Sequence, residues 1–500
     1  MKQVLILSLA FLAVTGCRKI ESDGEKEIVI VNQPVIPTGP TASTVTLSGR
    51  ITKDTTLYAK DFNYLQGLVY ITKGVTLTVQ AGAKVMGKYS GSDVSALIIC
   101  RGAKIIAKGT VDNPIIFTSA SANPQSGDWG GIVLCGIAPI NTSFTVAGVA
   151  VQGLYQVEGG VDNANGDGLA GAGDAAFPTV NAADNSGIIS YARIEYAGYA
   201  YQPDKEINSL TMAAVGSGTQ IDHVEAAYGK DDSFEWFGGT VNCKYLIAFK
   251  GQDDDFDTDN GYSGNVQFGI ALRDSAIADI SKSEAFESDN NATGTTALPK
   301  TTAVFSNMTV IGPRATLGSI GNSLFLAGAQ IRRNSGISIQ NSVFLGWPTA
   351  LLIDAGLGSP TDKNIDDSTI RFKNNTFAGN TANVKYTVNG TPTGATDASI
   401  LAWVSTPFYQ NAITTYAVDA KLIQPFNYTS FDATPYAGTA APLAANLSLG
   451  TAAFFNYASN GSFTDSKLQN AFVKAVAFRG AIGLNGEDAT WWKGWTKWNY

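Results

Sequence analysis

The sequence predicts an all-β protein, and within that class a parallel β-helix, from three observations. Glycine supplies 53 of the 500 residues, and Thr, Val and Ile are abundant, which is typical of short strands joined by many turns. The segment GKDDSFEWFGGTVN, which begins at Gly229, is repeated 22 residues later as GQDDDFDTDNGYSGNV from Gly251. Segments that begin at Phe305, Ile339 and Phe372 share an asparagine and a closing glycine, with starts 34 and 33 residues apart. A period in the low twenties indicates coils that bury their inward side chains only by stacking on one another.

The repeats also predict which side chains stack inside the solenoid. Phe234 and Phe256 occupy the same position of the 22-residue repeat, so we expect both to point inward. The shared asparagines should form a buried ladder that satisfies backbone groups at a turn: Asn307, Asn341 and Asn374. The stretch YARIEYAG is related to these segments and places Arg193 at the asparagine position. A β-propeller and a β-sandwich are alternatives, because both also use many short strands.

The chain begins with MKQVLILSLAFLAVTG, and residues 1–16 are expected to be a secretory signal peptide. Its apolar run is too short to span a bilayer. The residues Val14-Thr15-Gly16 before Cys17 match a bacterial lipobox, so we expect lipid attachment at Cys17. The alternative is an ordinary signal peptide followed by an unrelated cysteine.

Three further segments are expected after the lipidation site. Residues 17–43 combine mixed charge with three prolines, which is typical of a flexible tether. The β-helix is expected over residues 44–379, and residues 380–500 should continue it and cap it, with a short helix over 466–476. Four of the eight tryptophans lie in the last ten residues and are expected to cover the last open coil: Trp491, Trp492, Trp495 and Trp498.

Composition excludes several classes of function. The net charge of -8 argues against a face that neutralises nucleic-acid phosphates. A single histidine, His223, disfavours zinc sites with several histidines and Ser-His-Asp catalysis, and we assign it no role. Beyond Cys17 there are three cysteines, an odd number, so at least one buried free thiol is expected among Cys100, Cys135 and Cys243.

Several segments resemble a family of outer-membrane surface lipoproteins of the Bacteroidota. The resemblance is carried by residues 68–88, 95–119, 128–141 and 208–241, by DDDFDTDNGYSGNV and by the terminal WWKGWTKW. It implies a right-handed parallel β-helix, exposed on the outer membrane, and it names no reaction. The acidic residues that follow Cys17 are similar to the signals that sort such lipoproteins to the cell surface.

An acidic stretch between residues 231 and 289 carries most of the chemical content. It holds 13 of the 42 Asp and Glu residues, against about five for an even distribution. If the coils stack, Glu235 and Asp257 lie about 5 Å apart, and Glu287 extends the row. Stacked carboxylates repel one another unless a proton or a cation lies between them, and Ca²⁺ is the hard cation that accepts many oxygen ligands. The expected ligands are Asp231, Asp232, Glu235, Asp253, Asp254, Asp257 and Asp259. The alternative is a solvated acidic face.

Catalysis is a second interpretation of the same residues. Gly-Gln-Asp-Asp-Asp resembles the Gly-Asp-Asp segment of polygalacturonases, in which paired carboxyl groups act as acid and base. The chain departs from that family, because its histidine lies upstream of the acids and the Arg-Ile-Lys segment is missing. A β-helical lyase would need Ca²⁺ and a basic residue. The candidate catalytic residues are therefore Asp254, Asp257 and Arg273.

These observations predict a lipid-anchored cell-surface protein of the outer membrane, without interaction with nucleic acid. The preferred function is a non-enzymatic binding or scaffold module that holds a glycan or docks on an outer-membrane protein, such as uptake machinery. The alternative is a carbohydrate-active enzyme, a polysaccharide hydrolase or lyase, that uses the acidic stretch.

Overall fold

The structure, a computed structural model, describes residues 41–202, 205–314, 318, 321–389, 393–426, 432–435, 461–483 and 485–500. Residues 43–500 form one compact unit, separate from residues 1–42. The predictions of a signal peptide, of lipidation at Cys17 and of most of the tether lie outside the described residues.

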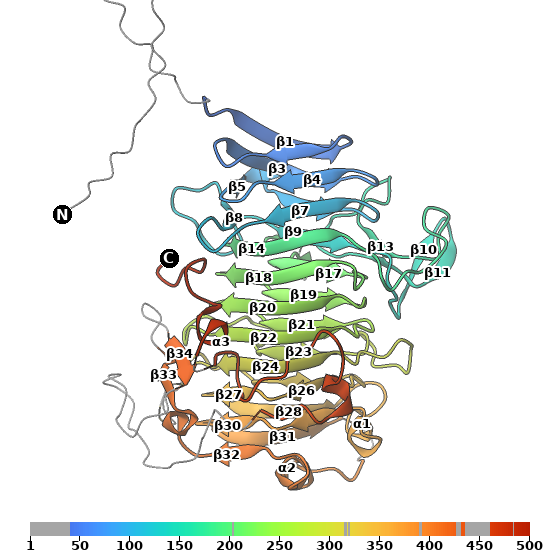
Figure 1. The fold of residues 1–500 in the computed structure, drawn as a ribbon. Coiled ribbons are helices and arrows are strands. Elements are labelled where there is room, and N and C mark those ends of the chain that lie inside the picture. The colour runs from blue at the N-terminus through green and yellow to red at the C-terminus, as the bar shows by residue number, and fades with distance from the viewer. Residues whose placement is uncertain are drawn as a thin grey trace, which may run out of the picture. The chain divides into compact units, whose positions relative to one another are not determined.

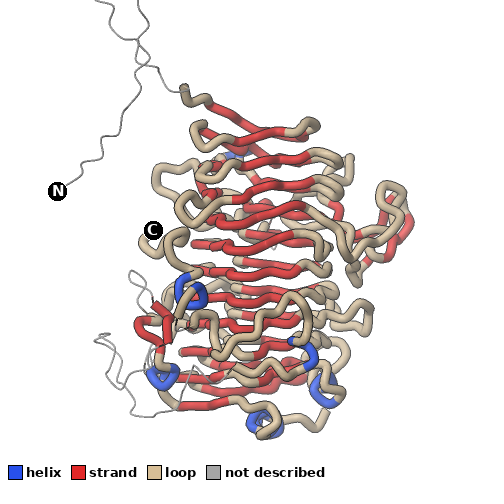
Figure 2. Tube along the Cα trace, in the orientation of Figure 1, coloured by secondary structure: helices blue, strands red, loops and turns tan. Residues whose placement is uncertain are grey.

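The described part of this unit folds as a right-handed parallel β-helix, as the sequence predicts (Figure 1). Among the described residues, 26 strands join one sheet, and all pairings in it are parallel, as in β19 with β21. The strands lie one above another as successive coils of the solenoid, and loops project from its edges (Figure 2). Pairing partners of the acidic coils are 22 and 30 residues apart, which confirms the repeat inferred from the sequence.

The coils present three faces, each a stack of parallel strands. The first face comprises β2 (Thr55–Leu57), β4 (Thr76–Val79), β7 (Lys104–Lys108), the first halves of β14 (Gly187–Glu195), β18 (Gln220–Ala227), β20 (Asn242–Phe249), β22 (Asn265–Leu272) and β24 (Val304–Ile311), then β26 (Ser338–Gln340) and β29 (Arg371–Lys373). The second face comprises the first halves of β1 (Thr44–Ile51) and β3 (Phe62–Ile71), β5 (Lys84–Gly87), β8 (Ile115–Ser119), the second halves of β14 to β24 named above, β27 (Val343–Leu345), β30 (Thr376–Ala378) and β32 (Ala412–Thr414). The third face comprises the second halves of β1 and β3, β6 (Ala96–Ile99), β9 (Gly131–Cys135), β17 (Leu210–Ala213), β19 (Phe234–Phe237), β21 (Phe256–Asp259), β23 (Phe286–Ser288), β25 (Gln330–Ile331), β28 (Thr349–Ala355) and β31 (Ala382–Val388).

The remaining elements lie in excursions from the coils. Antiparallel pairs are β10 (Ser143–Val146) with β11 (Val149–Gln152), β12 (Leu154–Gln156) with β13 (Leu169–Gly171), β15 (Ala200–Gln202) with β16 (Lys205–Glu206), and β33 (Leu422–Gln424) with β34 (Asp432–Pro435). The helices are α1 (Lys363–Asp366), α2 (Asp397–Ser405) and α3 (Glu487–Thr490), with 3₁₀ turns η1 (Gly91–Asp93), η2 (Ala417–Ala420) and η4 (Ser466–Leu468). No helix in these described ranges has the length and apolar character that a membrane crossing requires.

The corner between the first and second faces is built from residues with a left-handed backbone. Asn307, Asn341 and Asn374 have φ values of 58°, 53° and 58°, and all three are buried. Asn374 Nδ2 donates a hydrogen bond of 2.5 Å to Asn341 Oδ1, which confirms the asparagine ladder. Asparagine suits this corner because its short amide tolerates positive φ and can satisfy neighbouring polar groups.

Aromatic residues replace asparagine at the same corner in the preceding coils. Tyr191, His223, Tyr245 and Phe268 all have positive φ. The ring of His223 stacks on its two neighbours, with its centroid 4.1 Å from that of Tyr191 and 4.4 Å from that of Tyr245. The residue at the asparagine position is therefore Tyr191, and the alignment that placed Arg193 there is wrong by two residues. The single histidine is part of this stack.

Inside the solenoid, phenylalanines stack in register as predicted. Phe234, Phe256 and Phe286 are fully buried, with centroid separations of 5.8 and 5.3 Å between neighbouring coils. These inward side chains alternate with outward residues along each strand, so they determine which residues face outward.

Helix α2 covers the C-terminal end of the solenoid, and the tryptophans do not. Ile400 and Val404 of α2 are buried in the same core as the inward strand residues (Figure 1). The tryptophan-rich terminus instead lies on the outside of the second face, where Trp495 is 5.8 Å from His223. The prediction that tryptophans cover the last coil is wrong, because the middle coils offer outward apolar side chains, such as Phe249, that the terminus covers.

The predicted helix over residues 466–476 is also wrong. Only the turn η4 forms there. The backbone beyond it is bound to the solenoid instead of to itself, since Lys474 N donates to Gln267 Oε1 and Lys474 O accepts from Gln267 Nε2.

The three described cysteines are buried and free, which confirms the expectation of a free thiol. Burial raises the pKa of Cys135 to about 12. At neutral pH this thiol therefore behaves as a small apolar side chain.

Candidate functional site

An acidic cleft of about 600 Å³ lies on the outside of the third face. Its floor is formed by β19, β21 and β23 and by the segments that lead into them. Glu158 and Glu206 come from the excursions between β9 and β17, and residues 279–282 come from the loop before β23. The described lining carries eleven carboxyl groups and only three basic side chains, Lys230, Lys282 and Arg332.

The carboxyl groups of the floor form two columns along the solenoid axis. Glu235, Asp257 and Glu287 are paired in register on three consecutive coils, which confirms the predicted row. Neighbouring strands of a sheet are about 4.8 Å apart, so like charges in this column repel strongly.

The second column contains Asp232, Asp254 and Glu284. Asp232 Oδ1 accepts a hydrogen bond of 2.8 Å from Asp254 N, and Asp254 Oδ1 accepts one of 2.6 Å from Glu284 N. The carboxyl groups of Asp232 and Asp254 are thus each bound to the backbone of the next coil. The stacking that buries the phenylalanines therefore also holds these acids in place.

Six of the seven predicted ligands line the cleft. They are Asp231, Asp232, Glu235, Asp253, Asp254 and Asp257. Asp259 is not among the lining residues, and its Oδ1 accepts a hydrogen bond of 2.5 Å from Asn260 N. The ligand set predicted from the sequence lacked Glu284, although the alignment of Phe256 with Phe286 places it opposite Asp254. It also lacked Glu158 and Glu206, for which the repeat pattern offers no signal.

Burial and mutual repulsion raise the pKa of these carboxyl groups. The pKa values of Asp232, Glu235 and Asp254 lie well above their usual range, mainly through loss of solvation and then through neighbouring carboxylates. The same causes raise the pKa of Asp253 and of Asp257 to about 7. At neutral pH the cluster therefore holds protons or binds cations.

Arg332 is the arginine of the cleft. It forms ion pairs with Glu287 and, at 2.9 Å, with Asp289. Burial favours loss of its proton, but these carboxylates more than offset that effect and hold its pKa above the usual value. Arg332 therefore stays charged and cannot act as a general base.

Arg273, the predicted base, is not among the residues that line the cleft. The side chain is fully buried and forms an ion pair of 3.1 Å with Asp255, which is also fully buried. It donates a further hydrogen bond of 3.0 Å to Gly251 O. Both contacts hold the guanidinium in a fully buried position. The other two candidate catalytic residues, Asp254 and Asp257, do line the cleft.

The geometry of the carboxylates fits a hard cation. Three groups each offer three oxygen atoms within 4.8 Å of one another: Asp231, Asp232 and Asp253; Asp232, Glu235 and Asp257; Asp254, Glu284 and Glu287. Ligand oxygens on opposite sides of Ca²⁺ are about 5 Å apart, since each Ca–O distance is about 2.4 Å.

Two buried oxygens in these groups support a ligand role. Glu284 is 2% exposed, and its Oε1 accepts no hydrogen bond from the described residues. Asp257 Oδ1 is also buried and accepts no hydrogen bond within the described part of the chain. A buried carboxylate oxygen without a partner is costly, and a bound cation removes that cost. An all-oxygen donor set favours Ca²⁺ over zinc.

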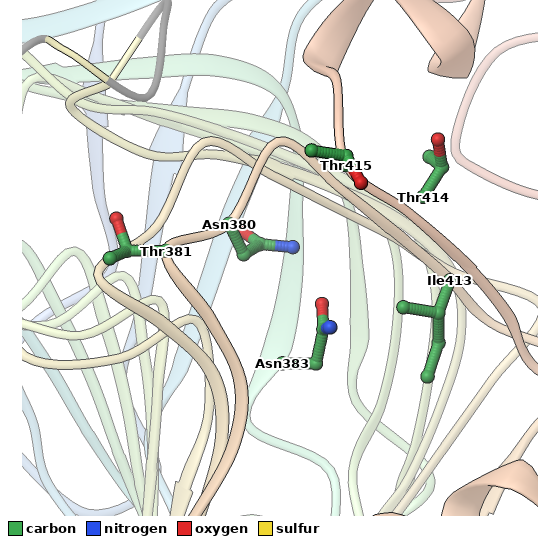
Figure 3. Close-up of a pocket in the computed structure, with 6 residues that line it drawn as sticks. All are labelled: Asn380, Thr381, Asn383, Ile413, Thr414 and Thr415. Atoms are coloured by element: carbon green, nitrogen blue, oxygen red, sulfur yellow. The ribbon is translucent and has the colours of Figure 1, made fainter.

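A second, smaller pocket of about 310 Å³ lies near the last coils, between β30 and β32 (Figure 3). Its lining is uncharged: Asn380, Thr381, Asn383, Ile413, Thr414 and Thr415. It offers neither an acid nor a base for catalysis, so the acidic cleft is the candidate functional site.

Comparison with known proteins agrees with this fold. A family model described as a pectate-lyase-like β-helix domain matches residues 49–412. No curated protein and no solved structure shows significant similarity to the chain.

Proposed function

The chain belongs to the pectate-lyase-like β-helix family, and from this premise we propose that its acidic cleft binds Ca²⁺ and, through the bound ion, an acidic polysaccharide. The observation that carries the proposal is the set of three carboxylate groups on consecutive coils. Pectate, after which the family is described, is itself an acidic polysaccharide, so the proposed ligand agrees with the family.

An acidic glycan could not enter this cleft without a cation. Eleven carboxyl groups would repel its negative charge. Bound Ca²⁺ supplies positive charge that protein carboxylates and glycan carboxylates can share. Asp232, Glu235 and Asp257 would hold one ion, and Asp254, Glu284 and Glu287 would hold a second, since the two groups have no residue in common.

Polysaccharide hydrolysis is a second candidate, favoured by the pKa values. Asp253 and Asp257 have pKa values raised to about 7, so near neutral pH each carboxyl group is partly protonated and partly ionised. A protonated and an ionised carboxyl group are the acid and the base of glycoside hydrolysis. A lyase is less well supported, because Arg332 keeps its proton.

Binding of tetragalacturonate to purified residues 43–500 tests the proposal. We expect binding in the presence of Ca²⁺ and none in a chelator. Asp257→Asn should weaken Ca²⁺ binding at least about tenfold, since one charge-assisted contact contributes about 1.5–3 kcal/mol. Asp112→Asn, at an exposed position outside the cleft, is the control and should change neither affinity.

Equal binding with and without the chelator would contradict the proposal. Release of reducing ends in the same incubations, abolished by Asp257→Asn in a folded protein, would favour the hydrolase instead.

We also propose that lipid on Cys17 anchors the module at the outer-membrane surface, as the lipobox indicates. In a full-length protein expressed in a Gram-negative host, Cys17→Ser should then move the protein from the membrane fraction to the soluble fraction. Retention of the variant in the membrane fraction would argue against lipid anchoring.

A further inference from the structure

Two lysines that line the acidic cleft make no direct contact with a carboxylate of the described residues. Lys230 and Lys282 both line the cleft and are exposed. Neither ammonium group forms an ion pair or a hydrogen bond with any residue that the structure describes, although eleven carboxyl groups share the cleft. By contrast, Arg332, the third basic residue there, is paired with two carboxylates.

The two lysines occupy the same position on alternate coils. Phe234, Phe256 and Phe286 are paired in register, and four residues before them lie Lys230, Gln252 and Lys282. Hydrogen bonds keep these segments in register, since Gln252 N donates to Gly229 O at 2.9 Å and the side chain of Ser283 donates from Oγ to Gln252 O at 2.8 Å. The lysines are therefore two coils apart, about 10 Å along the axis.

The residue at the same position on the coil between them, Gln252, carries no positive charge. Gln252 is neutral, and its Nε2 donates to Asp279 Oδ1 at 3.2 Å. Positive charge thus recurs at every second coil along one edge, while the carboxylate columns occupy every coil of the floor.

This pattern fits a linear polymer with regularly spaced anionic groups. In a nearly twofold chain of acid sugars, carboxylates point alternately to opposite sides, so those of every second sugar face the same way. A chain that lies along the solenoid axis would direct one set of carboxylates to the lysines. The other set would face the floor, where protein carboxylates and cations lie.

Resting on the proposed function, we infer that Lys230 and Lys282 hold the carboxylates of alternate sugars and so orient an acidic glycan along the axis. Each contact is a charge-assisted hydrogen bond, which contributes about tenfold in affinity. The lysines would also reject neutral glycans, because an uncharged sugar offers them no partner.

Calorimetric titration of residues 43–500 with tetragalacturonate in Ca²⁺ tests this inference. We expect Lys230→Ala and Lys282→Ala each to lower the affinity about tenfold, and the double variant about a hundredfold. With digalacturonate, which has no second alternate carboxylate, the double variant should lose no more than about tenfold. Lys53→Ala, an exposed lysine after β1, is the matched control and should bind as the wild type does.

Titration with Ca²⁺ alone separates the lysines from the cation sites. Removing a positive charge should leave the Ca²⁺ affinity unchanged or raise it. Undiminished glycan binding by the double variant would overturn the role of the lysines and leave the proposed function intact. Failure of the wild type to bind any tetragalacturonate in Ca²⁺ would overturn both.

Discussion

We expect the metal-free protein to lose stability as the pH rises from about 4 to about 8, and saturating Ca²⁺ to offset part of this loss. Burial raises the pKa of Asp253 and of Asp257 from 3.8 to about 7. Between these values the folded state binds more protons than the unfolded state, so stability is greatest below pH 4 for these groups and is lost as the pH passes 7. One such group contributes on the order of 4–5 kcal/mol, since one pKa unit corresponds to about 1.4 kcal/mol.

Chemical denaturation at several pH values, with and without Ca²⁺, measures this effect. Ligand at about a hundred times its dissociation constant adds about 2.7 kcal/mol to the free energy of unfolding. Asp257→Asn removes one titrating group and should flatten the pH dependence of the metal-free protein. A metal-free protein whose stability is unchanged between pH 5 and pH 8 would show that the pKa values of these carboxyl groups are not raised, and an unchanged stability on addition of Ca²⁺ would argue against a cation site.

We expect replacement of Arg273 with methionine to destabilise the fold by about 3–5 kcal/mol, because the carboxyl group of Asp255 is left buried without its partner. Both side chains are fully buried, so water cannot compensate for the loss. The measurement is the free energy of unfolding from a denaturant titration at neutral pH.

A double variant distinguishes this ion pair from simple loss of packing. Arg273→Met with Asp255→Asn should recover a large part of the stability, since no isolated charge remains. Arg50→Met is the matched control, because Arg50 pairs with Asp167 but is 44% exposed, and it should cost less than about 1 kcal/mol. If Arg273→Met left stability unchanged, the buried pair would have no structural role.

The stacking of the acids could be predicted from the sequence because it follows from register. Once Phe234 and Phe256 are taken as inward neighbours, Glu235 and Asp257 must be outward neighbours, and the structure confirms both pairs. The asparagine ladder was predictable for the same reason, since three copies of one motif repeat at nearly constant spacing.

Features that join distant parts of the chain could not be predicted in this way. Glu158 reaches the cleft from an excursion that belongs to no repeat. Arg273 lies within the acidic stretch in sequence, yet its side chain is buried against Asp255. The repeat pattern does not indicate which way this side chain points. The four tryptophans indicate that the C-terminus packs on an apolar surface, but the sequence does not indicate which surface that is.

The C-terminal segment on the second face changes the cooperativity of the solenoid. In a repeat fold each coil contacts only its neighbours, so the ends can unravel while the middle remains folded. Here Lys497 N donates to Glu225 Oε2, Lys474 N to Gln267 Oε1 and Ser462 N to Asn341 Oδ1, so one segment is bound to coils far apart. Unfolding of any of these coils breaks hydrogen bonds with the same C-terminal segment. We therefore expect the coils that carry the acidic cleft to open together.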